Sequence, residues 1–281
     1  MKSVRIGAIL AATIAVVGAA GASSATAQDA ARDTAHVTAQ AKPRPGIAAA
    51  VGPDLVAPPA GATARDDEAD PKVRKAQEIL TKFGIPTGAV DGHFGGETAR
   101  GLCAFRRIAG IGTTRAPLDA RTLTTLKAYD AKYRNLREIP AKTYAGKSTY
   151  LVAHQTCQVL FYVEGKQYRR VFASSMGVYG HGTPNGSYSL GNTLKGWYCS
   201  TLYPESCTNH SEGWFASISR YGNMYNPRQV VGAIYVHGST SVPPYPASHG
   251  CIRTTVKDAD WMYKYVGTNA RAPIFVTGKF A

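Results

Sequence analysis

The sequence has 281 residues, of which 44% are hydrophobic, 10% aromatic and only 18% charged. This composition supplies enough apolar side chains for the cores of two modest domains. With 29 glycines and 16 prolines, it excludes a coiled coil, an all-helical bundle and a fully disordered chain. The formal net charge of +14 predicts a polyanionic neighbourhood, and nucleic acid is the first polyanion that such a charge suggests.

The N-terminus has the three-part layout of a secretory signal peptide. Lys2 and Arg5 form a basic start, residues 6–20 are uncharged and apolar, and Ala25-Thr26-Ala27 supplies small residues for cleavage. An apolar run of about 15 residues is shorter than the roughly 20 that span a bilayer, although an uncleaved anchor is the alternative. Residues 1–27 are therefore predicted to be a signal peptide, and export argues against a nucleic-acid partner.

The next segment, residues 28–70, is rich in Ala, Pro and Thr and holds few large apolar side chains. It cannot bury enough surface to offset its ordering entropy, so we expect a disordered, flexible stalk. Four basic and seven acidic residues lie in this stalk and two basic residues lie in the signal peptide, so residues 71–281 carry a formal charge of +15. Outside a cell, anionic wall polymers and lipid headgroups are the polyanions that this charge can meet.

Residues 71–129 show the pattern of three short helices. Asp70-Pro71 is typical of a helix start and Gly84 of a helix end. A second helix is expected from about Glu97, with Cys103 on its exposed side, and Asp119 is expected to cap the third. Such a bundle has a small core and no evident catalytic constellation, so we predict that it binds rather than catalyses.

Several short elements of this bundle form a recognisable set. They are Gln77–Leu80, Asp91-Gly92-x-Phe94-Gly95, Glu97-Thr98, Leu102-x-x-Phe105 and Thr122-Leu123. With them, the segment resembles the three-helix peptidoglycan-binding domain, although Arg106 stands where that family usually has glutamine. His93 invites a metal interpretation, but no His or Cys cluster accompanies it, so we expect a solvated loop histidine.

Residues 147–279 change to the pattern of β-strands, after a predicted linker over 130–146. Polar turns separate apolar runs at 150–153, 159–163, 171–173 and 188–190, which predicts a sandwich or barrel-like sheet. Thr255 is expected to cap one late helix that Gly267 ends, and a closing strand is expected over 271–277. The predicted fold class is α+β, with the small three-helix bundle followed by a mainly-β domain.

Two motifs in the mainly-β domain carry the groups that a thiol nucleophile needs. His237-Gly238 ends an apolar strand, and Ser248-His249-Gly250-Cys251-Ile252-Arg253 follows after nine residues. An imidazole that takes the thiol proton creates the attacking thiolate, and Gly250 would let a backbone N–H approach the developing oxyanion. The alternatives are a buried histidine whose hydrogen bonds are made within the core, a disulfide-bonded cysteine, or a metal site of His237, His249 and Cys251.

The cysteine count bears on the identity of the nucleophile. The chain has five cysteines, and an odd number in an exported protein leaves one thiol unpaired. Cys199 and Cys207 could close a short loop. A pairing of Cys103 with Cys157, which lies in a predicted hairpin turn, would tie the two domains together. Cys251 is the best candidate for the free thiol.

The whole segment 147–279 resembles the L,D-transpeptidase catalytic domain of the YkuD type. The matching elements are the opening strands, Thr183-Pro184-x-Gly186, Met224-Tyr225, His237-Gly238 and Ser248–Arg253. The resemblance implies that Cys251 is acylated, that His237 is its base and that the Gly238 region orients the imidazole. It further implies an oxyanion site at His249, Gly250 and the Cys251 amide, and supporting or substrate-binding roles for Arg253, Ser248, Gly238, Met224 and Tyr225. The Trp197–Trp214 stretch departs from the family pattern and is a candidate lid.

The implied reaction is acyl transfer between peptidoglycan stem peptides, with no cofactor. It proceeds through a Cys251 thioester, releases D-alanine and gives a 3→3 cross-link. If water accepts the acyl group, the same site is an L,D-carboxypeptidase; an unrelated Cys/His wall-peptide hydrolase and a non-catalytic wall-binding protein are further alternatives. The expected partners are stem peptides, glycan strands and anionic wall polymers, with carbapenem-type β-lactams as covalent inhibitors. The expected location is extracytoplasmic, in the wall or the periplasm.

Overall fold

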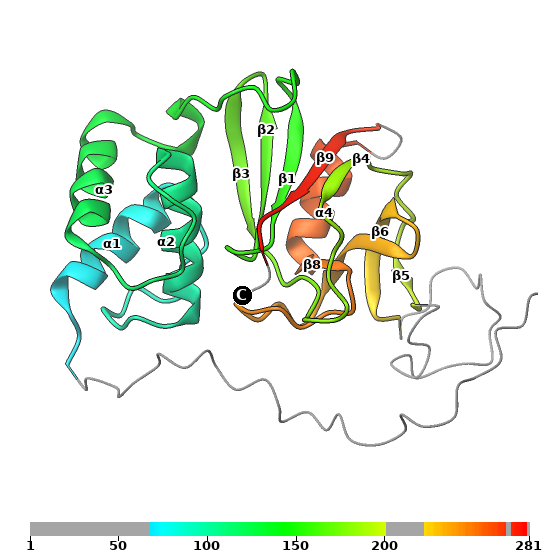
Figure 1. The fold of residues 1–281 in the computed structure, drawn as a ribbon, viewed down its shortest axis with the longest axis horizontal. Coiled ribbons are helices and arrows are strands. Elements are labelled where there is room, and N and C mark those ends of the chain that lie inside the picture. Colours follow the sequence, from blue (N-terminus) through cyan, green and yellow to red (C-terminus); the bar gives the residue numbers. More distant parts are fainter. Residues whose placement is uncertain (1–67, 201–221, 268–270, 280–281) are drawn as a thin grey trace, which may run out of the picture. The chain divides into compact units, whose positions relative to one another are not determined.

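The computed structural model describes residues 68–200, 222–267 and 271–279 (Figure 1). The predicted signal peptide, almost all of the predicted stalk, Cys207 and most of the Trp197–Trp214 stretch lie outside the described residues. Within the described ranges, none of the helices has the length and apolar character needed to cross a membrane.

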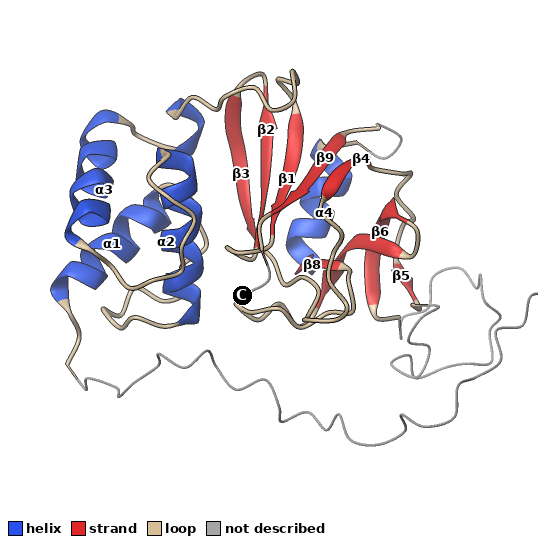
Figure 2. Ribbon diagram, viewed as in Figure 1, coloured by secondary structure: helices blue, strands red, loops and turns tan. Residues whose placement is uncertain are grey.

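Three helices open the described chain (Figure 2): α1 (Pro71–Lys82), α2 (Gly96–Ala109) and α3 (Ala120–Lys132). The side chain of Asp70 accepts a hydrogen bond from the Lys72 amide, and that of Asp119 accepts one from the Thr122 amide. These caps satisfy amides that would otherwise lack a partner in the first helical turn. The predicted helices and their caps are confirmed.

The side chain of Gln77 holds the Asp91-Gly92 pair of the α1–α2 connection. The Gln77 side chain is 1% exposed. Its Oε1 accepts hydrogen bonds from the amides of Asp91 and Gly92, and its Nε2 donates to the Asp91 carboxylate. One buried amide therefore fastens this loop onto α1. His93 is exposed in the same loop, as expected.

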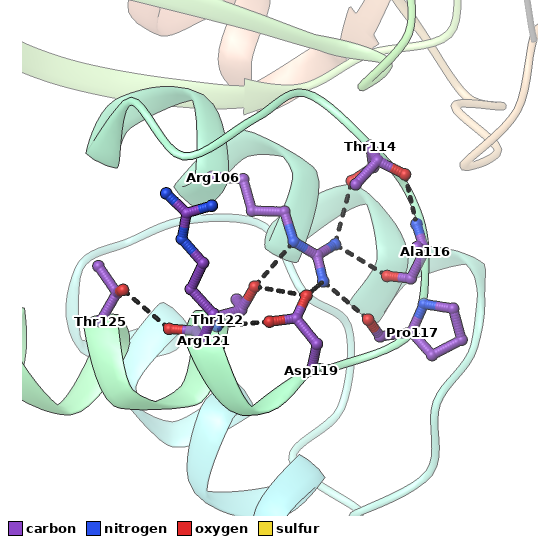
Figure 3. Close-up of polar contacts among 8 residues, drawn as sticks. All are labelled: Arg106, Thr114, Ala116, Pro117, Asp119, Arg121, Thr122 and Thr125. Atoms are coloured by element: carbon purple, nitrogen blue, oxygen red, sulfur yellow. Dashed lines mark hydrogen bonds and ion pairs between the residues drawn. The ribbon is translucent and has the colours of Figure 1, made fainter.

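Arg106 fastens the loop that leads into α3 (Figure 3). Its side chain is 2% exposed. The guanidinium donates to Thr122 Oγ1 at 2.9 Å, to Asp119 Oδ2 at 3.1 Å, and to the carbonyls of Thr114, Ala116 and Pro117 at 3.1, 2.8 and 2.7 Å. The buried guanidinium of Arg106 is therefore the centre of a polar cluster in which Thr122 is also buried and the other partners lie at exposed positions.

Arg106→Gln is expected to lower the free energy of unfolding by about 3 kcal/mol, because a shorter, uncharged carboxamide cannot serve the five acceptors that the buried guanidinium pairs. Urea unfolding followed by circular dichroism measures the loss. Arg121→Gln is the matched control, since Arg121 is exposed on α3 and should change stability by less than about 0.5 kcal/mol. Equal stability of the two variants would contradict the role given to Arg106.

The strands form two sheets. The first has the order β3-β2-β1-β9-β4 and the second the order β5-β6-β7-β8. The bounds are β1 (Tyr150–His154), β2 (Val159–Glu164), β3 (Gln167–Ala173), β4 (Gly186–Ser189), β5 (Trp197–Tyr198), β6 (Met224–Val231), β7 (Ile234–Ser239), β8 (Ile252–Thr255) and β9 (Pro273–Thr277). The β1–β9 and β7–β8 ladders are parallel and the others are antiparallel. The expected mainly-β domain is confirmed as two sheets. The late helix is α4 (Val256–Tyr265), capped by Thr255.

The central strands β1 and β2 of the five-stranded sheet are buried on both faces. Along β1, Leu151 belongs to one core, together with residues of the second sheet such as Val236 and with Met262 of α4. Its neighbour Val152 belongs to a different core, which includes residues of the three helices. Successive side chains point to opposite faces of a strand, so double burial explains why this segment is continuously apolar.

The three helices share their core with this sheet rather than forming a separate bundle. Phe105 of α2, Leu126 of α3 and Phe161 of β2 belong to one cluster of buried side chains. The predicted linker also joins this cluster through buried residues of the 3-10 helix η2 (Leu136–Glu138) and of the segment after it. The domain boundaries at 129 and 147 therefore remain a prediction.

The expectation of an exposed Cys103 is wrong. Cys103 is fully buried and forms a disulfide with Cys157, with their Cα atoms 5.3 Å apart. The reason is that α2 has a second buried side, toward the sheet, which helical periodicity alone did not separate from a solvent face. The predicted Cys103–Cys157 pairing is confirmed. Cys199 is also disulfide-bonded, and its predicted pairing with Cys207 stays a prediction.

Candidate active site

The parallel pair β7–β8 brings the two sequence motifs together. His237 lies opposite Arg253 in the ladder, and Cys251 directly precedes β8. Val236 and Ile252 both enter the core between the sheets. Because side chains alternate along a strand, His237, Cys251 and Arg253 are placed on the opposite face from this core. Histidine and cysteine motifs that are far apart in sequence thus share one face of one sheet.

Cys251 is a free cysteine and is half-buried. The Ala233 carbonyl oxygen lies 4.0 Å from its Sγ. Burial raises the pKa of the Cys251 thiol above its usual value, while a hydrogen bond from the Tyr235 backbone and the charge of Arg253 partly oppose the rise. At neutral pH the resting side chain is therefore a thiol, and it needs a base to become a nucleophile.

His237 has the protonation state of such a base. Its ring is 4% exposed, and burial lowers its pKa to about 4. Nδ1 lies 2.9 Å from the Gly238 carbonyl oxygen. A carbonyl can only accept, so this hydrogen bond places the proton on Nδ1 and leaves Nε2 able to take one. The imidazole is neutral at pH 7.

The thiol of Cys251 and the imidazole of His237 are both neutral at pH 7. The described residues show no hydrogen bond between the His237 ring and Cys251 Sγ. With the pKa of the thiol raised and that of the imidazole lowered, a preformed thiolate–imidazolium pair is disfavoured. These protonation states fit proton transfer that accompanies attack, which is general-base catalysis.

Ser248 and Thr183 hold the loop in front of Cys251. Ser248 Oγ donates to the Cys251 carbonyl at 2.6 Å and accepts from the Gly250 amide at 3.2 Å. Thr183 Oγ1 donates to the Gly250 carbonyl at 2.7 Å. Gly250 has φ +117°, a conformation that glycine adopts without strain. Its amide is already paired, which leaves the Cys251 amide as the better candidate for an oxyanion donor.

The structure gives Gly238 a packing role besides its contact with the imidazole. A Cβ atom there would lie 3.0 Å from Ala259 Cβ, 3.1 Å from Tyr225 Cβ and 3.1 Å from Val256 Cα. A side chain at this position would have to push Ala259, Tyr225 or the start of α4 away by a few tenths of an ångström, so Gly238 acts on the site through the position of the backbone.

The remaining predicted site residues differ in what they touch. Met224 is buried at the start of β6. The hydroxyl of Tyr225 donates to Asp260 Oδ1 at 2.9 Å. The exposed ring of His249 makes an edge contact with His181, with centroids 4.9 Å apart. Substrate contacts of these three residues stay predictions. The loop-supporting role of Thr183 was not predicted, because its contact with the Gly250 carbonyl joins segments distant in the sequence.

Arg253 presents a cation beside the thiol. Its backbone is paired with Ser175 through two hydrogen bonds, at 2.9 and 3.1 Å. Burial lowers the pKa of its guanidinium, and the neighbouring Cys251 opposes this. No carboxylate of the described residues forms an ion pair with it, so its guanidinium is a candidate for an anionic group of a substrate.

A long segment of the chain matches a known protein family. Residues 148–276 match the family model of the L,D-transpeptidase catalytic domain. This agrees with the resemblance that the sequence motifs indicate, and this segment is called the transpeptidase-like domain below. It includes Cys251, His237 and both sheets.

Solved L,D-transpeptidase structures resemble the chain. One from Xylanimonas cellulosilytica is 25% identical, with a TM-score of 0.45, covering 79% of this chain and 100% of that one. One from Stackebrandtia nassauensis is 16% identical, with a TM-score of 0.42, covering 75% and 93%. L,D-transpeptidase 3 from Mycobacterium tuberculosis, in complex with a faropenem-derived adduct, is 19% identical, with a TM-score of 0.37, covering 47% and 61%. No curated protein sequence matches the chain.

No group of three or more His, Cys, Asp or Glu side chains that could hold a metal ion occurs among the residues described. A cavity of about 600 Å³ is lined by the α1–α2 connection, η2, β3 and Asp258. Because its lining does not include Cys251 or His237, this cavity is distinct from the candidate active site.

Two buried histidines predict an acid-sensitive fold. Burial lowers the pKa of both His154 and His237 to about 4. The unfolded chain takes up protons near pH 6.5 and the folded chain only near 4, so stability is complete above pH 6.5 and falls as the pH drops toward 4. Protonation of each histidine is expected to lower the free energy of unfolding by up to about 3 kcal/mol.

Urea unfolding between pH 7.5 and 5 tests this expectation, because that window lies above the titration of ordinary carboxylates. His93→Gln is the control, since His93 is exposed and should leave the pH dependence unchanged. A free energy of unfolding that does not fall between pH 6.5 and 5 would show that the two rings are protonated in the folded protein.

Proposed function

We propose that the chain is a cysteine-dependent L,D-transpeptidase that cross-links peptidoglycan stem peptides. The observation that carries the proposal is the free thiol of Cys251 on the same sheet face as the neutral imidazole of His237, within a segment that matches the L,D-transpeptidase catalytic domain. The proposal gives the thiol the role of nucleophile and the imidazole that of its base.

In the first half-reaction, the Cys251 sulfur attacks the carbonyl carbon of the third residue of a donor stem. His237 Nε2 takes the thiol proton as the S–C bond forms, and the Cys251 amide donates to the oxyanion. The peptide bond to the terminal D-alanine then breaks, and the imidazolium gives its proton to the departing amine. The products are a thioester on Cys251 and free D-alanine.

In the second half-reaction, the side-chain amine of another stem attacks the thioester carbonyl. His237 takes a proton from this amine, the S–C bond breaks and the sulfur is reprotonated. The new amide bond is a 3→3 cross-link. A thioester suits this step because it is activated toward amines, and hydrolysis by water instead would make the same site an L,D-carboxypeptidase.

The charge and organisation of the chain fit an extracytoplasmic wall enzyme. Residues 71–281 carry a formal charge of +15, which favours residence among anionic wall polymers. Arg253 is proposed to meet a carboxylate of the stem peptide. The helices α1–α3 are proposed to bind peptidoglycan, and residues 1–27 to direct export. A reactive Cys251 thiol is also proposed to capture carbapenem-type β-lactams covalently.

Mass spectrometry of purified disaccharide-tetrapeptide after incubation with the chain tests the proposal, with Cys251→Ala as the control. We expect a dimer that lacks one D-alanine, absent with the variant. Disaccharide-tripeptide without dimer would reassign the activity to an L,D-carboxypeptidase. If neither product forms while the chain still binds intact wall fragments, the proposal would be replaced by that of a non-catalytic wall-binding protein.

A further inference from the structure

We propose that Arg100 of α2 is a positioning residue for the active site, holding in place the two backbone segments that carry the nucleophile loop and Arg253. This inference rests on the proposed function for its catalytic consequence. It assigns part of the active-site architecture to α2, which lies outside the segment that matches the family model.

Arg100 is buried at a junction of segments distant in sequence. Its side chain is 1% exposed. One terminal nitrogen lies 2.8 Å from Glu97 Oε2. The other donates to three carbonyl oxygens: Ser174 at 3.2 Å, Val242 at 3.2 Å and Pro243 at 2.5 Å. The guanidinium serves Glu97 and the carbonyls from two separate nitrogens, with the two hydrogens of one nitrogen shared among three carbonyls, whereas the single ammonium of lysine has three donors for these four acceptors.

The first of these segments, residues 174–176, directly contacts the active-site backbone. Ser174 Oγ donates to the Arg253 carbonyl at 2.9 Å. The backbone of Ser175 pairs with Arg253. The Met176 carbonyl accepts from the amide of Ser248, the residue that holds Gly250 and Cys251. A shift of residues 174–176 would therefore move Arg253 and the nucleophile loop together.

The second segment, residues 242–245, leads into the nucleophile loop. It is tied to the first, because Ser175 Oγ donates to the Tyr245 carbonyl at 2.8 Å. Arg100 joins both segments through its carbonyl contacts, and burial of unpaired carbonyls would be costly if it were removed. The contact with α2 is also close: a Cβ atom on Gly96 would lie 2.7 Å from Pro244 Cγ.

Gly96→Ala tests the inference without removing a buried charge. The added methyl group collides with Pro244 and should displace residues 242–245. Gly95→Ala is the matched control, since a Cβ atom on Gly95 meets nothing within 4 Å. We expect the rate of the proposed acyl transfer by Gly96→Ala to fall about 10²-fold through kcat, the size of effect that a displacement of about 1 Å produces. Gly95→Ala should keep the wild-type rate.

Arg100→Met and Arg100→Lys extend the test, with Arg121→Met as the control. The second readout is the pH midpoint of Cys251 alkylation by iodoacetamide, which does not depend on the proposed reaction. The charge of Arg253 lowers the pKa of the Cys251 thiol, so a displaced Arg253 should raise this midpoint. Arg100→Lys keeps the buried charge and covers the case in which Arg100→Met does not fold.

The two readouts separate the inference from the proposed function. A raised midpoint in folded Arg100→Lys or Gly96→Ala supports the positioning role, even if the wild-type chain shows no acyl transfer and the proposed function fails. Wild-type midpoints in both variants, as in Gly95→Ala and Arg121→Met, would overturn the positioning role, whatever the activity of the wild-type chain.

Discussion

His237→Ala is expected to slow acylation of Cys251 by about 10³-fold at pH 7, within the range that a positioned general base contributes. The reason is the protonation state of the resting pair. Burial raises the pKa of the thiol, so almost no thiolate exists at pH 7 and attack depends on the imidazole. Stopped-flow measurement of acylation by imipenem gives the rate, and intact-protein mass spectrometry gives the stoichiometry.

His93→Ala is the matched control, because His93 is an exposed loop histidine and its loss should leave acylation unchanged. The wild-type rate should be nearly constant from pH 8 to pH 6 and fall as the pH approaches 4, where a protonated His237 can no longer accept a proton. A His237→Ala rate within tenfold of the wild-type rate would show that another group, or water, takes the thiol proton.

Removal of the Cys103–Cys157 disulfide by a double substitution to alanine is expected to lower the free energy of unfolding by about 4 kcal/mol. The bond closes a loop with a sequence separation of 54, and the chain-entropy relation gives this magnitude for a loop of that length. The unfolded variant should also be more expanded, so the dependence of its stability on urea should steepen.

Cys251→Ala is the matched control for this measurement. It also removes a sulfur atom, but from a free cysteine, and should change stability by less than about 1 kcal/mol. A loss below about 1 kcal/mol in the double variant would show that the shared core of the helices and the sheet, rather than the disulfide, holds α2 in place.

The helix caps and the catalytic pair could be predicted from the sequence. Asp70 and Asp119 cap their helices as predicted because a short side chain reaches amides two or three residues ahead. Thr255 caps α4 for the same reason. His237 and Cys251 could also be paired in advance from the chemistry of their motifs and from the family resemblance. The strand that follows Cys251 was not predicted, and its parallel register with β7 is what places the two residues on one face.

Contacts between segments that are distant in the sequence could not be predicted in this way. The burial of Cys103 depends on a sheet that meets a second side of α2, and helical periodicity reveals a second buried side only weakly. The carbonyl contacts of Arg100 and Arg106 join loops by backbone atoms, which carry no residue-specific signal. The pairing of the Gly250 amide with Ser248 likewise follows from loop geometry.

The central claim is that Cys251 carries the acyl group, and capture of the acyl-enzyme tests it most directly. The chain is quenched with acid soon after it is mixed with disaccharide-tetrapeptide, and intact-protein mass spectrometry is followed by peptide mapping. The account predicts a mass gain equal to the donor minus one D-alanine, located on the peptide that contains Cys251 and absent from Cys251→Ala. Cross-linked product formed without this adduct, or by Cys251→Ala, would contradict it.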